Sequence, residues 1–307
     1  MEQHLYMVLQ SLNIPLDLNA PEVVDTYDEL PLWSALFGVL LLQHVPLRRG
    51  IVALDIGCGT GFPLLELAQR LGPTARVVGI DPWKAALNRA RRKAQIWGVR
   101  NVSVVPADAA ALPLPDASVD LIVSNLGVNN VVDIGVVLRE CRRVARPEAT
   151  IALTTNLVGH MREFYEIFTD LLRRDHHDAA LNWLEAHITH RATVSGLTAQ
   201  LQGAGFTVGR VVEDELPLRF ADGTALLQHS FIKLAFLPAW LDVVEPHRQR
   251  ATFERLEAAL NALAVSRGEL LLTIIRTISP TAGERGTQTP APTTLSPNSA
   301  TSTSALR

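Results

Sequence analysis

Short apolar runs alternate with longer amphipathic stretches from residue 51 onward. The apolar runs are rich in β-branched residues, as buried strands are, whereas the amphipathic stretches repeat with helical spacing. Strands that alternate with helices imply right-handed crossovers, so the pattern predicts a parallel sheet covered on both faces. The predicted strands are 51–56, 76–80, 102–105, 119–124 and 150–155, and the predicted helices are 63–72, 83–98 and 134–145.

The pattern changes after the fifth predicted strand. Long helical segments now separate the last two strands, so we expect two helical insertions, near 158–193 and 216–266, around one sheet. The residues between them read as a helix, a glycine turn and a strand, and a final strand follows the second insertion. The helical segments cover 158–190 and 219–265, the mixed segment 195–215, and the final strand 269–278.

Both ends of the chain differ from the alternating region. Residues 1–45 contain the longest apolar stretch, "LWSALFGVLLLQHV". That stretch is shorter than the roughly 20 residues that cross a bilayer, so we expect an N-terminal helical cap and no membrane span. Residues 46–278 form the expected main domain. Residues 279–307 consist mainly of Thr, Ser, Pro and Gly, which predicts a disordered tail.

Composition narrows the classes of protein. The 307 residues are 48% hydrophobic and 19% charged, which suits one large domain with additions or two small domains. A net charge of −3 argues against a nucleic-acid-binding surface. The two cysteines, Cys58 and Cys141, cannot form a disulfide framework or a four-thiolate metal site, so we interpret both as packing residues. Few cysteines and no signal peptide favour a cytoplasmic protein.

The glycine-rich loop "LDIGCGTGFP" at 54–63 is the main candidate for a ligand site. A Walker A loop needs Lys and then Ser or Thr after its last glycine, whereas this loop continues with Phe-Pro. A dinucleotide loop has the spacing G-x-G-x-x-G, whereas this loop has G-x-G-x-G. Asp55 stands at the end of the strand before the loop, where a carboxylate would repel a pyrophosphate and attract a cationic group.

S-adenosylmethionine (SAM) carries an ammonium, a sulfonium and a carboxylate but no phosphate. The loop, followed in order by "VGIDPW" (78–83) and "PADAAALPLPDASVDLIVSN" (106–125), resembles the motifs of class I SAM-dependent methyltransferases over roughly residues 46–215. Segments around the motifs, such as "SNLGVNN", resemble the UbiE-like, type 11 group. The resemblance implies an α/β fold: a Rossmann-like, doubly wound, mostly parallel seven-stranded sheet with helical cap insertions.

The resemblance also implies the roles of individual residues. Asp81 would accept both ribose hydroxyls, although it could also cap the following helix. Pro82 and Trp83 would lie against the adenine, although Trp83 could equally be a core residue. Asp108 and the Ala109 backbone would meet the adenine edge. The expected cofactor residues are Asp55, Gly57, Gly59, Gly61, Asp81, Pro82, Trp83, Asp108, Ala109 and Asn125, the last of which ends the fourth strand.

Acceptor residues are expected beyond the carboxyl ends of the strands. Methyl transfer needs a general base only if the acceptor loses a proton, and His160 is our first choice, with orientation of the next helix as the alternative. Arg219, expected in the second insertion, could anchor an acceptor carboxylate or pair with Glu213, Asp214 or Glu215. The histidines at 176–190 lack a spaced acidic or thiol partner, so no metal is expected. The other candidate substrate residues are Asn129, Asn130, His229 and Tyr27.

The sequence thus predicts a SAM-dependent methyltransferase that acts on a small-molecule acceptor through an O, C or N nucleophile. We expect neither nucleic acid nor a membrane span, and the oligomeric state, including a homodimer, stays open. One alternative is a SAM-binding sensor or partner subunit without catalysis. The other is an NAD-dependent oxidoreductase, which Asp55 and the glycine spacing disfavour.

Overall fold

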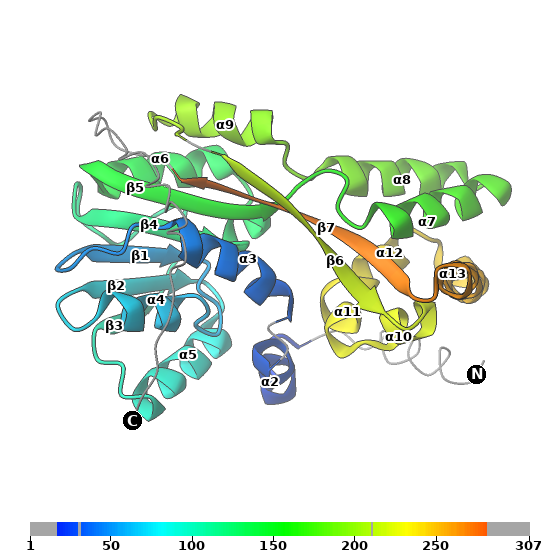
Figure 1. The fold of residues 1–307 in the computed structure, drawn as a ribbon, viewed down its shortest axis with the longest axis horizontal. Coiled ribbons are helices and arrows are strands. Elements are labelled where there is room, and N and C mark those ends of the chain that lie inside the picture. Colours follow the sequence, from blue (N-terminus) through cyan, green and yellow to red (C-terminus); the bar gives the residue numbers. More distant parts are fainter. Residues whose placement is uncertain (1–16, 30–31, 210, 281–307) are drawn as a thin grey trace, which may run out of the picture.

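A computed structural model describes residues 17–29, 32–209 and 211–280 of the chain. These residues form a seven-stranded sheet with helices on both faces and a separate group of helices beyond one end (Figure 1). The expected tail from residue 281 onward and the first part of the N-terminal cap lie outside the described residues. The strands are β1 (Val52–Ile56), β2 (Arg76–Asp81), β3 (Val102–Pro106), β4 (Val119–Asn125), β5 (Ala145–Asn156), β6 (Val212–Phe220) and β7 (Leu270–Pro280).

A helix follows β1, β2 and β4, β3 leads directly into β4, and the later helices follow in groups. The first five predicted strands and the three predicted helices between them are all present. The helices are α2 (Pro21–Glu29), α3 (Leu32–His44), α4 (Leu64–Leu71), α5 (Lys84–Ile96), α6 (Ile134–Val144), α7 (Arg162–Arg174), α8 (Asp178–Thr189), α9 (Val194–Gly203), α10 (Gly223–Gln228), α11 (Ser230–Ala235), α12 (Leu237–Asp242) and α13 (Pro246–Arg267), with a 3-10 turn η1 (Gly127–Asn130).

The strand order is β3-β2-β1-β4-β5-β7-β6, so the seven-stranded, mostly parallel sheet is confirmed. β1 to β5 run parallel, whereas β7 is antiparallel to both of its neighbours. In the dinucleotide-binding fold the order is 3-2-1-4-5-6. The reversed strand inserted between β5 and β6 separates this sheet from that fold.

Alternate side chains of each buried strand serve two different helix layers. Ala53 of β1 packs with α3, α4 and α5, while Leu54 packs with α6 and α9 on the other face. The sheet is therefore doubly wound, as predicted. The apolar face of α6 packs in the second layer, where Val137, Leu138 and Cys141 are all buried, so Cys141 is a packing residue as predicted.

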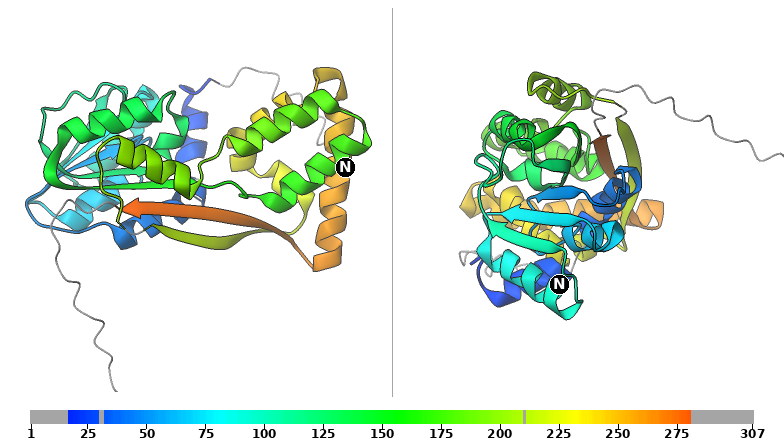
Figure 2. Two further views of the ribbon diagram at one scale, coloured as in Figure 1. Left: turned by 90° about the horizontal axis from the view of Figure 1, so that it is seen from above. Right: turned by 90° about the vertical axis from the view of Figure 1, so that its left-hand side faces the viewer.

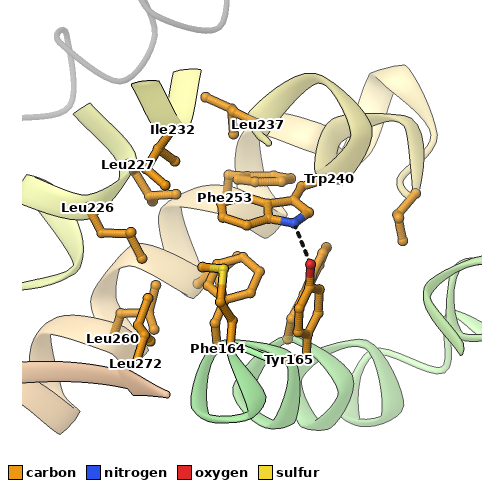
Figure 3. Close-up of a cluster of buried hydrophobic side chains, with 14 of the residues drawn as sticks. Phe164, Tyr165, Leu226, Leu227, Ile232, Leu237, Trp240, Phe253, Leu260 and Leu272 are labelled. Atoms are coloured by element: carbon orange, nitrogen blue, oxygen red, sulfur yellow. Dashed lines mark hydrogen bonds between the residues drawn. The ribbon is translucent and has the colours of Figure 1, made fainter. Parts of the chain in front are cut away.

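β6 and β7 extend beyond the other strands of the sheet, and a second hydrophobic core packs against their extended part. Helices α7, α8 and α10 to α13 pack around them, and we call this group the helical lobe (Figure 2). Its core is aromatic: Trp240 and Phe164 stack with ring centroids 4.0 Å apart, and Phe253 is fully buried beside them (Figure 3). Because both predicted insertions contribute to this one core, they form one structural unit.

Three predicted boundaries differ from the structure. β5 begins at Ala145, so it starts earlier than the predicted strand 150–155, and the segment 146–149 is extended chain. β6 continues to Phe220, because its side chains alternate between half-buried and exposed while it pairs with β7 along its whole length. Arg219 therefore lies on a strand and the second insertion begins only at residue 221. β7 continues to Pro280, two residues into the expected tail.

Candidate cofactor and acceptor site

The glycine loop after β1 is held against the loop after β4. A Cβ atom on Gly57, whose φ is +71°, would lie 2.6 Å from the Cα of Gly127, so no side chain fits there. The backbone N–H groups of Gly57 and Cys58 donate to the carbonyl of Ile80 at the end of β2. The loop thus lies where β1, β2 and β4 end, at the point where the strand order reverses, which is where open α/β sheets bind ligands.

Asp55 is the most unusual residue of this loop region. Its side chain is fully buried, and neither carboxylate oxygen has a hydrogen-bond partner of normal geometry among the described residues, although the backbone of Leu64 is near enough to favour the charged form. Burial, and then the charge of Asp81, raise the pKa of Asp55 well above its usual range. A buried carboxylate without a partner costs stability. An ammonium group such as that of SAM would remove this penalty, so the residue fits a cationic ligand.

Asp81 at the end of β2 joins the glycine loop to the start of α5. Its Oδ2 atom accepts the N–H of Gly59 at 2.9 Å, and its Oδ1 atom accepts the N–H of Trp83 at 2.8 Å. Trp83 is itself the N-cap residue of α5, so Asp81 makes a turn before the helix rather than capping it. A carboxylate has about four acceptor positions, which leaves capacity for a ligand diol.

Tyr27 of α2 covers the glycine loop from the N-terminal side. Its ring would be 3.8 Å from a Cβ atom on Gly59, and it meets the ring of Trp83 edge-on at 5.3 Å. Trp83 also donates its indole N–H to the carbonyl of Leu18 at 2.8 Å. Trp83 therefore contacts the N-terminal segment rather than the sheet core. Tyr27, which we expected to contact the acceptor, lies against the glycine loop instead.

An ion-pair cluster holds α2 in this position. The carboxylate of Asp28, only 7% exposed, accepts the Nε–H of Arg89 at 2.7 Å and also pairs with Lys93, both on α5. Burial alone would raise the pKa of Asp28, but hydrogen bonds from Lys93 and Arg89 outweigh it and keep the pKa below its usual value. No motif in the sequence marks Asp28, because its partners are more than 60 residues away.

The candidate residues after β3 and β4 mostly hold the framework. Asp108 accepts the N–H of Ala110, two residues on, at 2.9 Å, and Ala109 is buried. The amide of Asn125 donates to Ser34 of α3 at 2.9 Å and accepts from Thr154 of β5 at 2.8 Å. Asn125 therefore fixes α3 over the ends of β4 and β5.

The two asparagines after β4 lie at the carboxyl edge of the sheet. Asn129 accepts from Thr155 at 2.6 Å and donates to Asn156 at 2.8 Å, both at the end of β5. Asn130 is exposed at the end of η1. Both residues are thus near the switch point, but neither lines the apolar pocket described below.

His160 follows β5 and is 1% exposed. Its ring meets the indole of Trp33 edge-on, with centroids 4.7 Å apart. Burial, and then the charge of Arg191, lower the pKa of His160 to about 3. Such an imidazole is neutral but a weak base, so this environment counts against His160 as the general base.

An apolar pocket of about 300 Å³ lies where α3, the end of β6 and α11 meet. Arg219 and His229, which are ten residues apart in the sequence, both line it. Arg219 pairs with Glu269 at 2.6 Å and not with any of the three expected acids. Burial, and then Lys233, lower the pKa of His229. The pocket is lined by Trp33, Leu218, Arg219, Phe220, Ala221, His229, Phe231 and Ile232.

No group of three or more His, Cys, Asp or Glu residues within the described ranges could hold a metal ion. The two cysteines are buried, and burial raises the pKa of the Cys141 thiol to about 12. Both environments suit packing rather than reactivity. In the same ranges, no helix is both long and apolar enough to cross a membrane.

Comparison with known proteins gives the class that this fold and site define. Residues 54–153 match the family described as "Methyltransferase domain". The chain is a class I SAM-dependent methyltransferase, and SAM is its cofactor.

The individual relatives that the chain resembles include demethylmenaquinone methyltransferases. The demethylmenaquinone methyltransferase of Geobacillus stearothermophilus is 29% identical over 177 residues, which cover 54% of this chain and 75% of the relative. That of Staphylococcus aureus is 36% identical over 107 residues, covering 35% of this chain and 44% of the relative. The UbiE-like resemblance read from the sequence is therefore confirmed.

Solved structures share the fold. The YcgJ protein from Bacillus subtilis aligns with a TM-score of 0.54 at 18% identity, covering 82% of this chain and all of that chain. A phosphoethanolamine N-methyltransferase of Haemonchus contortus aligns with a TM-score of 0.51 at 14% identity, covering 86% of this chain and 57% of that one.

Proposed function

We propose that this methyltransferase acts on a small, largely apolar and aromatic acceptor that binds in the pocket between α3, β6 and α11. The observation that carries the proposal is the lining of that pocket: aromatic and aliphatic side chains with two polar groups, Arg219 and His229. This mixture is usual for sites that bind small organic molecules. The names of the demethylmenaquinone methyltransferases support a quinone-like acceptor.

The cofactor residues follow from the contacts at the sheet edge. We assign Asp55 to the ammonium of SAM, because its orphaned oxygens need a cationic partner. Asp81 has acceptor capacity left for the ribose hydroxyls after binding two backbone N–H groups. Pro82 and Trp83 would lie along the adenine, with Asp108 and Ala109 at its edge. Gly57, Gly59 and Gly61, all with positive φ, let the backbone approach the ligand, and Asn125 positions α3 over it.

The protein needs little chemistry of its own for methyl transfer. SAM supplies a methyl group on a sulfonium, which an acceptor nucleophile takes by in-line displacement. Alignment of the two molecules and exclusion of water then provide much of the rate. In this chain α2 covers the glycine loop, and the aromatic core of the helical lobe backs the apolar pocket. Whether O, C or N receives the methyl depends on the acceptor.

The test is transfer of labelled methyl from SAM into a fractionated metabolite extract. We expect label in a small, apolar fraction, and no label with the Gly59→Val variant, since a branched side chain at φ +49° blocks the loop. Calorimetric titration with SAM and with NAD accompanies it. SAM binding without any labelled product would favour a sensor or partner subunit, and binding of NAD instead of SAM would refute the proposal.

A further inference from the structure

Buried polar atoms without partners gather at two places in the chain. Six buried side-chain N or O atoms lack a hydrogen bond of normal geometry within the described ranges, and two of them are the oxygens of Asp55. Three others belong to His160 and Arg191: both ring nitrogens of the histidine and Nε of the arginine. Since such atoms cost stability, each cluster needs an explanation. The cofactor explains the first cluster, and nothing described so far explains the second.

Arg191 is a buried cation without an anion. It is 9% exposed, and no carboxylate lies within ion-pair distance of it in the part of the chain that the structure describes. Its Nη2 atom donates to the hydroxyl of Tyr165 at 2.7 Å, and its Nη1 atom donates to the carbonyl of His187 at 3.1 Å. Trp240 donates to the same hydroxyl at 3.1 Å (Figure 3). All of these partners are neutral, so the charge is oriented but not neutralised.

Backbone contacts place His160 beside Arg191. The loop that leads into His160 forms a parallel bridge from Leu157 to Ala192, the residue after Arg191. The N–H of Val158 also donates to the carbonyl of Ala192 at 3.1 Å. The charge of Arg191 therefore acts on the imidazole, which it helps to keep neutral. The backbone of Ile275 also acts on the imidazole, although outside normal hydrogen-bond geometry. A neutral imidazole offers one N–H donor, and the free Nε–H of Arg191 offers a second.

Trp33 connects this pair to the acceptor pocket. One edge of its indole meets His160, and the same ring lines the pocket and stacks on Phe231 with centroids 6.2 Å apart. His160 and Arg191 thus lie behind the pocket wall that Trp33 makes. Neither His160 nor Arg191 lines the pocket in this structure, so the ring of Trp33 has to move before a bound molecule can reach them.

We propose that His160 and Arg191 form an anion-binding subsite at the inner end of the acceptor pocket, which takes an acidic oxygen of an aromatic acceptor. The subsite rests on the proposed function, because it assigns the acceptor's chemistry at the same pocket. The oxygen would accept the Nε–H of Arg191 and the N–H of His160, and it would supply the missing counter-charge. Charge-assisted bonds of this kind are about twice as strong as neutral ones. The acceptor class is therefore an aromatic compound with a carboxylate, phenolate or enolate oxygen.

The probe is 1-naphthoate, compared with the neutral 1-naphthylmethanol, titrated by calorimetry into protein saturated with S-adenosylhomocysteine. We expect naphthoate to bind more tightly than the alcohol. Arg191→Gln should weaken naphthoate binding 10-fold or more and leave the alcohol within two-fold. Arg191→Lys should lose less than Arg191→Gln, because it keeps the charge. Arg173→Gln, which removes an exposed arginine from the same lobe, is the control and should change neither.

A second measurement follows naphthoate binding in the wild-type protein and needs the His160→Phe variant only to assign one signal. With ring-labelled histidine, naphthoate should shift the NMR signal that His160→Phe removes, and the alcohol should not. Wild-type naphthoate binding that leaves this signal unmoved would overturn the subsite. So would a larger loss in Arg219→Gln than in Arg191→Gln, which would place the anion at the pocket mouth. If S-adenosylhomocysteine binds and naphthoate does not, the subsite fails while the proposed function stands; if neither binds, both fail.

Discussion

Two buried ionisable residues have polar atoms without hydrogen-bond partners of normal geometry. Asp55 and His160 are both almost fully buried, and both have polar atoms without partners. Burial moves their pKa values in opposite directions, up for the carboxyl and down for the imidazole. Each residue is therefore neutral or close to it in a dry environment, and each responds to a charged neighbour. That response gives two predictions.

Binding of SAM should release a proton from Asp55. An ammonium beside the carboxylate favours its charged form, so the raised pKa of Asp55 falls when the cofactor binds. Calorimetry of SAM binding in buffers of different ionisation enthalpy measures the number of protons released. We expect a release in the wild-type protein that is absent in Asp55→Asn, together with an affinity loss of about 10-fold or more. Equal proton counts in the two proteins would contradict the assignment of Asp55.

The stability of the folded chain should fall as the pH is lowered from about 6.5, the ordinary histidine value. With a pKa of about 3 in the folded chain, His160 stays unprotonated there, whereas the unfolded chain binds the proton. Proton binding lowers the free energy of the unfolded state relative to the folded state. Asp55, with a raised folded pKa, acts in the opposite sense. His160→Phe isolates the histidine: between pH 6.5 and 4.5 its free energy of unfolding should fall by about 2 kcal/mol less than that of the wild type. Parallel curves from urea unfolding would refute this environment for His160.

Helix α2 shows how one element closes the cofactor site. It contacts both α5 and α11, so it links the sheet to the helical lobe (Figure 1). Tyr27 covers the glycine loop, while Asp28 in the next position is fixed to Arg89 and Lys93. If SAM binds at the glycine loop, it lies beneath this helix and leaves when the ion pairs open. We therefore expect the helix to control cofactor exchange, in the manner of other lids.

Asp28→Asn should speed SAM dissociation. Removing the Asp28 carboxylate leaves Lys93 without its ion-pair partner and leaves Arg89 with only the longer pairs to Asp25 and Glu29. Breaking a mostly buried pair in this way is destabilising, so we expect dissociation about 10-fold faster and a lower melting temperature. Stopped-flow competition with S-adenosylhomocysteine measures the rate. Asp25→Asn is the matched control, because Asp25 also pairs with Arg89, at 3.4 Å, but is 51% exposed. An Asp28 variant that releases SAM no faster than the Asp25 variant would show that α2 does not limit exchange.

The whole molecule divides the work between two hydrophobic cores. The sheet and its two helix layers carry the glycine loop at the carboxyl end of β1. The apolar pocket lies on the side of the helical lobe. The two parts are joined by β6 and β7, which belong to both (Figure 2). Cofactor binding and acceptor binding should therefore respond to different substitutions.

Arg219→Ala and His229→Ala should separate the two activities. Both residues line the pocket and neither contacts the glycine loop, so SAM affinity should stay within a few-fold of wild type. Methyl transfer to the acceptor should fall about 10-fold or more, since a hydrogen bond to a charged group is worth roughly 1.5–3 kcal/mol. Arg173→Ala, which like Arg219 is 66% exposed, is the control. Wild-type transfer rates in both pocket variants would place the acceptor elsewhere.

Much of the sheet and the glycine loop could be predicted from the sequence, because their signals are local. β-Branched runs, helical spacing and the G-x-G-x-G loop after an acidic strand end each lie within about ten residues, and the structure has each of these elements in place. The family follows from the same motifs, and residues 54–153 carry it. Alternation along a strand also fixes which side chains are buried, since a strand places successive residues on opposite faces.

Only the tertiary structure decided which distant residues meet. Asp28 pairs with Arg89 and Lys93. Arg219 pairs with Glu269 rather than with an acid near it in sequence. His160 contacts the ring of Trp33 and is affected by the charge of Arg191. No local pattern encodes these pairs, because burial and the packing of the helical lobe select them. The sequence by itself determined that this chain has a SAM-binding methyltransferase fold. The partners that surround each charge, and so the chemistry of the pocket, depend on how the second core folds against the first.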